Sequence, residues 1–194
     1  IFIRKIGGLT GGYAEVNLKF LANLAKDEKV NEVIVEDNFG GGMFNELLGP
    51  VMRSVGHPVT ITGVTNRTQK ERRIIDTLEP VINQHKLVIG EESLKDDVRS
   101  VQKYSEEDKV SKTLMHQLTR ISYDKGALKF DDRLDVLAIG VGHFNATIAR
   151  DSEQAIDDLY EQRRLEELQK YIDQHSQDPF GDAQGAMDWG TPYG

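Results

Sequence analysis

The first 150 residues alternate between short apolar runs and segments in which apolar residues recur at helical spacing. Runs rich in β-branched residues predict strands over about 1–6, 33–35, 59–62 and 87–89. Helical spacing predicts helices over about 16–24, 43–53, 70–79 and 110–122, whereas the polar residues 91–109 predict a loop. Because strands alternate with helices, we expect an α/β fold with a mixed sheet flanked by helices.

The segment that follows residue 133 carries the clearest apolar face of the chain. Its apolar residues fall at positions i, i+3, i+4, i+7 and i+14: Leu134, Leu137, Ala138, Val141 and Ile148. This spacing predicts one buried face of a helix.

Three carboxylates lie at the start of this helix: Asp131, Asp132 and Asp135. Asp131 is in position to be the N-cap, and Asp135 lies one turn further along the same side. A cap needs only one carboxylate, and three that crowd beside a core helix repel one another unless a positive charge lies among them. A divalent cation is the simplest such charge, and ordinary capping is the alternative for part of this acid.

A second acidic position lies at the end of a predicted strand. Glu36 and Asp37 directly follow the β-branched run 33–35. Sites are commonly built at the carboxyl ends of strands in α/β sheets. Together with the aspartates, and in a chain without cysteine, this acid fits an oxygen-ligand site for Mg²⁺ or Mn²⁺. The alternative is a strand-end acid that faces solvent.

Basic residues gather around the start of the helix 70–79, where Thr68 and Glu71 predict a capping box. The basic residues of this cluster are Arg67, Lys70, Arg72 and Arg73. Backbone amides and basic side chains at a helix N-terminus can bind a phosphate, so we expect contact with DNA here. Lys125 and Lys129, which precede the aspartates, are similar candidates. The alternative is a solvated helix face.

The composition fits one domain and an appendage. The 194 residues have a net charge of −8 and no cysteine. The whole excess of acid lies in residues 151–194, since residues 1–150 are balanced. We expect one domain over 1–150, a C-terminal helix over 151–176 and a flexible acidic tail over 177–194. No apolar run is long enough to span a membrane, so no membrane partner is expected.

Several segments together resemble the nuclease domain of the phage terminase large subunit, most closely its short-tailed phage branch. They are residues 36–44, residues 69–80, and residues 125–128 leading into 131–135. The resemblance covers about residues 1–150 in the expected order. It implies an RNase H-like fold and a metal-dependent endonuclease that cuts concatemeric viral DNA during genome packaging in the host cytoplasm.

The resemblance also implies which residues bind the catalytic metal ions. Glu36, Asp131 and Asp132 would hold two divalent ions, Mg²⁺ or Mn²⁺, with Asp135 as an auxiliary ligand. The implied partners are double-stranded DNA, the portal protein and the small terminase subunit. Two parts of the family pattern are not found: the strand that carries a first catalytic Asp and the ATPase phosphate loop. We therefore expect this chain to be a piece of a longer polypeptide.

Two other functions fit the same residues. One is another RNase H-like nuclease of the resolvase type. The other is a non-catalytic docking module of the packaging motor, which the missing first acid favours.

Overall fold

The computed structural model describes residues 1–37, 42–66 and 68–175. The chain divides into two compact units, Ile1–Asn145 and Ala146–Gly194. Arg67 and the predicted acidic tail over 177–194 lie outside the described residues.

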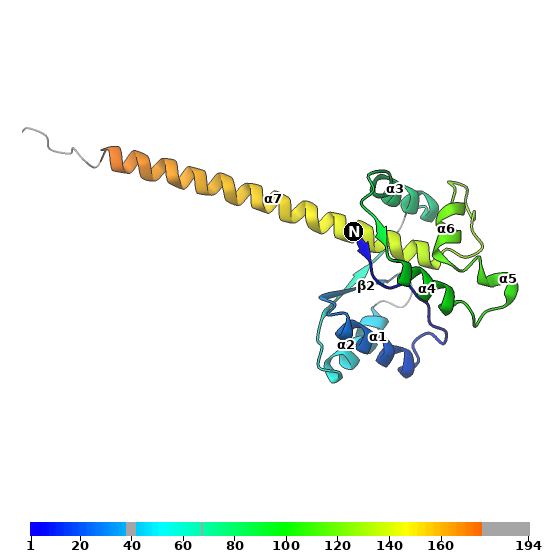
Figure 1. The fold of residues 1–194 in the computed structure, drawn as a ribbon. Coiled ribbons are helices and arrows are strands. Elements are labelled where there is room, and N and C mark those ends of the chain that lie inside the picture. Colours follow the sequence, from blue (N-terminus) through cyan, green and yellow to red (C-terminus); the bar gives the residue numbers. More distant parts are fainter. Residues whose placement is uncertain (38–41, 67, 176–194) are drawn as a thin grey trace, which may run out of the picture. The chain divides into compact units, whose positions relative to one another are not determined.

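Strands and helices alternate along the first unit as far as its fourth strand, and helices alone follow (Figure 1). In chain order they are β1 (Phe2–Ile3), α1 (Glu15–Asp27), β2 (Glu32–Glu36), α2 (Met43–Ser54), β3 (Thr60–Val64), α3 (Lys70–Asn83), β4 (Val88–Ile89), α4 (Glu91–Ser100), α5 (Glu106–Lys109), α6 (Leu114–Arg120) and α7 (Asp132–His175). The predicted α/β class is confirmed.

The sheets are small. Within the described residues β1 pairs with β4, and β2 pairs with β3, both in parallel. The prediction of one mixed sheet is therefore not confirmed.

Two apolar clusters form the core of the first unit. One joins α1 and α2 to β2 and β3, and Figure 1 shows these two helices lying together. The other joins α3 and α6 to the first turns of α7, with β1 and β4 packed against it. The predicted buried face of α7 is confirmed for Leu134, Leu137, Ala138 and Val141, which all belong to the second cluster. It was wrong for Ile148, which is 48% exposed and belongs to the second unit, beyond the residues that form this cluster.

The prediction of a loop over 91–109 was wrong, because α4 and α5 occupy most of it. The buried face of α4 and the turn after it consists of Ser93, Asp97 and Val101, spaced four residues apart. Two of these three residues are polar, so the face leaves no apolar signal in the sequence.

The C-terminal unit contains the end of one long helix. The helix predicted over about 151–176 is the continuation of α7, which runs without a break to His175. Within the described residues, no helix combines the length and the apolar character that a membrane span requires.

Candidate active site at the start of helix α7

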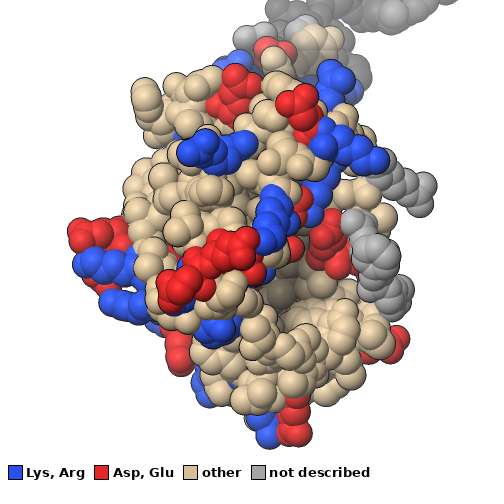
Figure 2. All heavy atoms as spheres, turned by 90° about the vertical axis from the view of Figure 1, so that its right-hand side faces the viewer, with Lys and Arg blue, Asp and Glu red and all other residues tan. Residues whose placement is uncertain are grey.

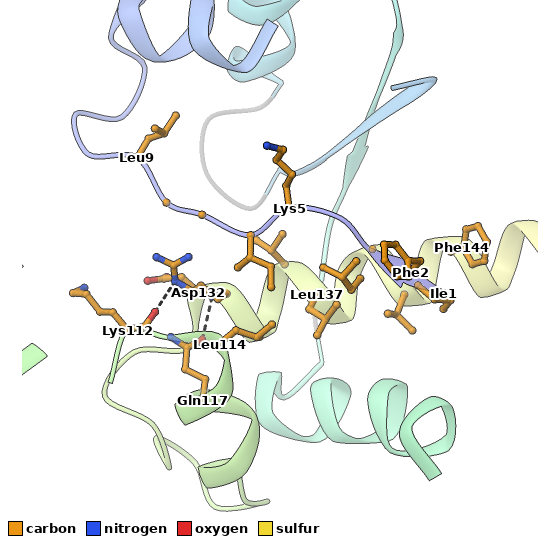
Figure 3. Close-up of a pocket in the computed structure, with 18 of the residues that line it drawn as sticks. Ile1, Phe2, Lys5, Leu9, Lys112, Leu114, Gln117, Asp132, Leu137 and Phe144 are labelled. Carbon is orange, nitrogen blue, oxygen red and sulfur yellow. Dashed lines mark hydrogen bonds between the residues drawn. The ribbon is translucent and has the colours of Figure 1, made fainter. Parts of the chain in front are cut away.

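Helix α7 begins directly after Asp131, whose backbone carbonyl accepts a hydrogen bond from Asp135 N at 2.9 Å. The side chain that satisfies the first amides of this helix comes from elsewhere. Gln117 Oε1 accepts hydrogen bonds from Arg133 N at 3.1 Å and from Leu134 N at 3.0 Å. Figure 3 shows Gln117 beside the start of α7. Gln117 is 1% exposed. Asp131 is therefore the N-cap by position, but its carboxylate is available for another partner.

That partner is α3. Lys70 Nζ lies 2.9 Å from Asp131 Oδ1 and 2.9 Å from Asp135 Oδ2. Arg73, one turn further along α3, donates a hydrogen bond to Asp135 Oδ1. Two cations thus compensate the crowded aspartates, the role for which the sequence suggested a divalent ion.

The pKa of Lys70 reflects this environment. Burial alone would lower the pKa of its ammonium group, but hydrogen bonds and charge attraction from Asp135 and Asp131 outweigh that effect and raise the pKa above its ordinary value. The ammonium group is therefore charged throughout the neutral range.

A buried ion pair fixes the same helix from the other side. Arg133 Nη1 lies 2.5 Å from Asp97 Oδ1, and the two side chains are 9% and 2% exposed. Arg133 also donates to Lys112 O at 2.6 Å and to Ser100 Oγ at 2.7 Å. Asp97 Oδ2 accepts from Leu114 N at 2.8 Å. Burial raises the pKa of the Asp97 carboxyl, although the Leu114 amide and the charge of Arg133 oppose this.

Asp132 is exposed and contributes to the wall of a pocket of about 690 Å³. Figure 3 shows the N-terminal segment from Ile1 to Leu9 running along one side of this pocket and the first turns of α7 along another. The aspartates at the start of α7 thus meet different surroundings: Asp135 is buried against cations, whereas Asp132 reaches solvent.

The other predicted acids lie at the carboxyl end of β2. Glu36 is exposed, and Asn66 Nδ2 donates to its Oε1 at 3.3 Å. Asp37 Oδ1 accepts a hydrogen bond from Gly42 N at 2.7 Å, at the start of α2. Asp37 therefore supports the local backbone, which leaves Glu36 as the candidate acid of this strand end.

The predicted DNA-binding residues differ in their surroundings. Arg72 is 70% exposed with Asp76 at 3.6 Å, whereas Lys70 and Arg73 are held by the aspartates. Lys129 Nζ lies 2.7 Å from Asp108, and this contact raises its pKa. Lys125 lies in the turn that contains Gly126. On the face drawn in Figure 2, Lys and Arg side chains lie next to Asp and Glu side chains.

The capping box predicted from Thr68 was wrong. The N-cap of α3 is Gln69, and the Glu71 carboxylate accepts a hydrogen bond from Gly126 N at 2.7 Å instead. Glu71 thus joins the start of α3 to the turn that leads into the aspartates.

The carboxylates have the oxygen-donor chemistry that a divalent ion requires, but in this arrangement they do not fit a preformed metal site. Asp131 is in contact with Lys70, and both oxygens of Asp135 are paired with cations. Across the described residues, no three His, Asp or Glu side chains are grouped as a metal ion would need.

Residues 1–87 match the family model described as "Terminase Bacteriophage T7, Ribonuclease H-like domain". The "Terminase, large subunit" of Enterobacteria phage T3 is 34% identical to the chain over 183 residues. The chain is thus similar to the phage terminase large subunit. The resemblance predicted from the sequence is confirmed. The alignment with the T3 terminase covers 94% of this chain and 30% of the T3 protein. The segment that matches the terminase family model includes Glu36, Lys70 and Arg73, and it ends before Asp131.

Sequence reasoning missed three residues of this site: Gln117, Asp97 and Arg133. Arg133 lies inside the acidic motif, and its position between carboxylates was the one available signal. Gln117 falls at the i+3 position of the apolar face formed by Leu114, Leu118 and Ile121, and this spacing was its signal in the sequence. Asp97 is identified by its burial.

Proposed function

We propose that this chain is the nuclease part of a viral terminase large subunit and that it cuts concatemeric viral DNA during genome packaging. The observation that carries the proposal is the acidic start of α7, where Asp131 and Asp132 precede a buried helix in a chain related to phage terminases. Two adjacent carboxylates at the start of a core helix supply oxygen donors of the kind that a divalent ion in phosphodiester hydrolysis would require.

In this proposal Glu36, Asp131 and Asp132 hold Mg²⁺ or Mn²⁺, and Asp135 supports them. Since both oxygens of Asp135 already have cationic partners, its role is to hold Lys70 and Arg73 rather than an ion. Asp131 can act as a ligand only after it has exchanged its contact with Lys70.

The proposal extends to partners and organisation. Double-stranded DNA is the substrate, and the portal protein and the small terminase subunit are the packaging partners, in the cytoplasm of the infected cell. Residues 1–150 form the RNase H-like nuclease domain. The C-terminal helix over 151–176 and the acidic tail over 177–194 then bind other proteins of the packaging motor.

In this proposal Arg72 is the residue of α3 that contacts the DNA. This side chain lies on α3, the helix that supplies Lys70, and it is 70% exposed. A guanidinium group at this position can reach a phosphate without leaving a buried partner, unlike Arg73.

Nicking of a supercoiled plasmid tests the proposal. We expect the protein to convert the plasmid to its open-circular form in Mn²⁺ and to leave it intact in EDTA. Binding of the plasmid without cleavage, at any divalent ion concentration, would contradict a nuclease and favour a docking module. Selective cleavage of branched DNA over plasmid would favour a resolvase-type nuclease.

A further inference from the structure

Lys112 lies between two aromatic rings that come from other parts of the chain. Its ammonium nitrogen is 3.4 Å from the centre of the Phe130 ring and 4.5 Å from the centre of the Tyr104 ring. Tyr104 follows α4, Lys112 lies between α5 and α6, and Phe130 precedes the start of α7. Because the faces of aromatic rings attract cations, the two rings together hold this ammonium group in one place.

Two nearby lysines are held by carboxylates instead. Lys129 Nζ lies 2.7 Å from Asp108, and Lys109 is bound to Glu106. The positive charges of these two lysines are thus compensated at close range. Lys112 attracts Asp108 as well, but among the residues that the structure describes it forms no salt bridge. Lys112 is therefore a fixed ammonium group whose charge is not neutralised by direct contact with an acid.

Lys103 adds a second such charge to the same surface. Its Nζ donates a hydrogen bond to Gly8 O at 2.7 Å and lies 5.5 Å from the centre of the Tyr104 ring. Both of these partners are uncharged, so the charge of Lys103 is retained. Lys103 is exposed and Lys112 is partly exposed, so both ammonium groups can be reached from solvent.

Lys112 is joined to the start of α7. Its backbone carbonyl accepts a hydrogen bond from Arg133 Nε at 2.6 Å, which ties this segment to the first turn of the helix. Lys112, Asp132 and Arg133 all line the pocket of about 690 Å³, and Figure 3 shows Lys112 and Asp132 at the same end of it. The ammonium group thus lies beside the part of the chain to which the proposed function assigns cleavage.

We propose that Lys112 binds a phosphate of double-stranded DNA, that Tyr104 and Phe130 position its ammonium group for this contact, and that Lys103 binds a second phosphate. This inference rests on the proposed function, which supplies DNA as the partner. An ammonium group held by rings keeps its N–H donors and its charge, so it can bind a phosphate without first leaving a carboxylate. Since lysines already lie over the rings, the arrangement favours contact with the DNA backbone over stacking of a base.

The charge and the rings have separable effects. Lys112→Met leaves an unbranched side chain that can pack between the rings, but it removes the charge. We expect its affinity for DNA to fall about tenfold at low salt, and the slope of log K against log salt to become shallower by about one unit. Tyr104→Leu keeps the charge of Lys112 but loses a ring, so we expect the affinity to fall about threefold with an unchanged slope. A residue with only a structural role would not change the slope.

Fluorescence anisotropy with a short labelled DNA duplex, in EDTA and at several salt concentrations, measures these effects without cleavage. Lys112→Arg keeps the charge and should stay near the wild-type slope. Lys109→Met is the matched control, because it removes an equal charge that Glu106 compensates and should leave the slope unchanged. The double variant with Lys103→Met and Lys112→Met should lose about two units of slope, one for each phosphate contact.

An unchanged slope for Lys112→Met, in a wild type that binds the duplex and nicks plasmid, would overturn the inference and leave the proposed function standing. A shallower slope for Lys112→Met in a protein that does not nick plasmid would support the DNA contact and contradict the nuclease. Equal effects of Lys109→Met and Lys112→Met would overturn the inference, because a general loss of positive charge would explain both. Failure of both Lys112→Met and Lys112→Gln to fold would also overturn it, because Lys112 would then be needed for the fold.

Discussion

Gln117 Oε1 accepts a hydrogen bond from Leu134 N at 3.0 Å, so a side chain of α6 caps α7 from outside the helix. The neighbouring Arg133 N donates to the same oxygen. Both amides belong to the first turn of α7, where intrahelical acceptors are lacking. Because Gln117 performs this function, the Asp131 carboxylate can face α3.

The first prediction concerns this cap. Gln117→Met keeps the length of the side chain but leaves two amides without an acceptor, so the free energy of unfolding should fall by roughly 1–3 kcal/mol. Urea denaturation measures it. Gln102→Met is the matched control, because the side chain of the exposed Gln102 donates to Val98 O and its loss should cost less than about 0.5 kcal/mol. Equal effects of the two substitutions would contradict the assigned cap.

The second prediction concerns the ion pair between Asp97 and Arg133. Each side chain is almost fully buried, so Asp97→Ala or Arg133→Met alone should destabilise the protein by roughly 3–5 kcal/mol, because one buried charge is left unpaired. The double variant should be more stable than the sum of the single effects implies. Asp96 and Arg99, an exposed pair 2.7 Å apart on the same helix, provide the control cycle. The coupling energy of this control pair should be below about 1 kcal/mol. Additive effects of the substitutions at Asp97 and Arg133 would show that the buried pair is not formed.

The third prediction concerns pH. The hydrogen bond from Gly126 N lowers the pKa of the Glu71 carboxyl below its ordinary value of 4.5. A carboxyl with a lowered pKa in the folded state contributes stability that is present above its ordinary pKa and is lost as the pH falls through the lowered value. The wild type should therefore be more stable than Glu71→Gln at pH 7, and the difference should shrink as the pH falls below 4.5. Thermal melts of both proteins over this range measure it, and a difference that stays constant with pH would refute the contact.

The sequence predicted the parts of the fold that depend on local apolar pattern. Leu134, Leu137, Ala138 and Val141 are buried as their spacing requires. The same pattern located the helix α1 but did not define its buried face, because Val16 is exposed and the smaller Ala22 is fully buried. Apolar spacing identifies a helix, but the choice of the buried face also depends on how closely a neighbouring element packs.

The candidate site was predictable only in part. The acids were visible as a motif, and the need for a positive charge among them followed from their crowding. The source of that charge was not visible, because Lys70 and Arg73 precede their aspartate partners by 61 and 62 residues. Such pairings depend on how α3 packs against α7, which no local pattern encodes.

The fourth prediction concerns DNA. Arg72 is exposed and can reach a phosphate, whereas Arg73 is 15% exposed and paired with Asp135. Arg72→Ala should weaken DNA binding without regard to sequence and lower the slope of log K against log salt by about one unit, since one phosphate contact is lost. Lys95→Ala, which removes a charge from α4, should leave the slope unchanged, and fluorescence anisotropy at several salt concentrations measures both. An unchanged slope for Arg72→Ala would show that this part of α3 is a solvated helix face without a phosphate contact.

The final prediction addresses the acidic site itself through plasmid nicking in Mn²⁺. Glu36→Gln, Asp131→Asn and Asp132→Asn should each reduce the nicking rate at least about a hundredfold with little change in stability, because each removes a proposed metal ligand. Asp37→Asn should be milder, since the Asp37 carboxylate accepts a hydrogen bond from Gly42 N. Asp96→Asn, which changes a partly exposed acid of α4, should nick like the wild type.

The nicking rate of Asp131→Asn relative to the wild type is the most direct measurement of the central claim. We predict a loss of cleavage in a folded protein that still binds DNA. A folded Asp131→Asn variant that cleaves at the wild-type rate would contradict the assignment of the active site to the start of α7.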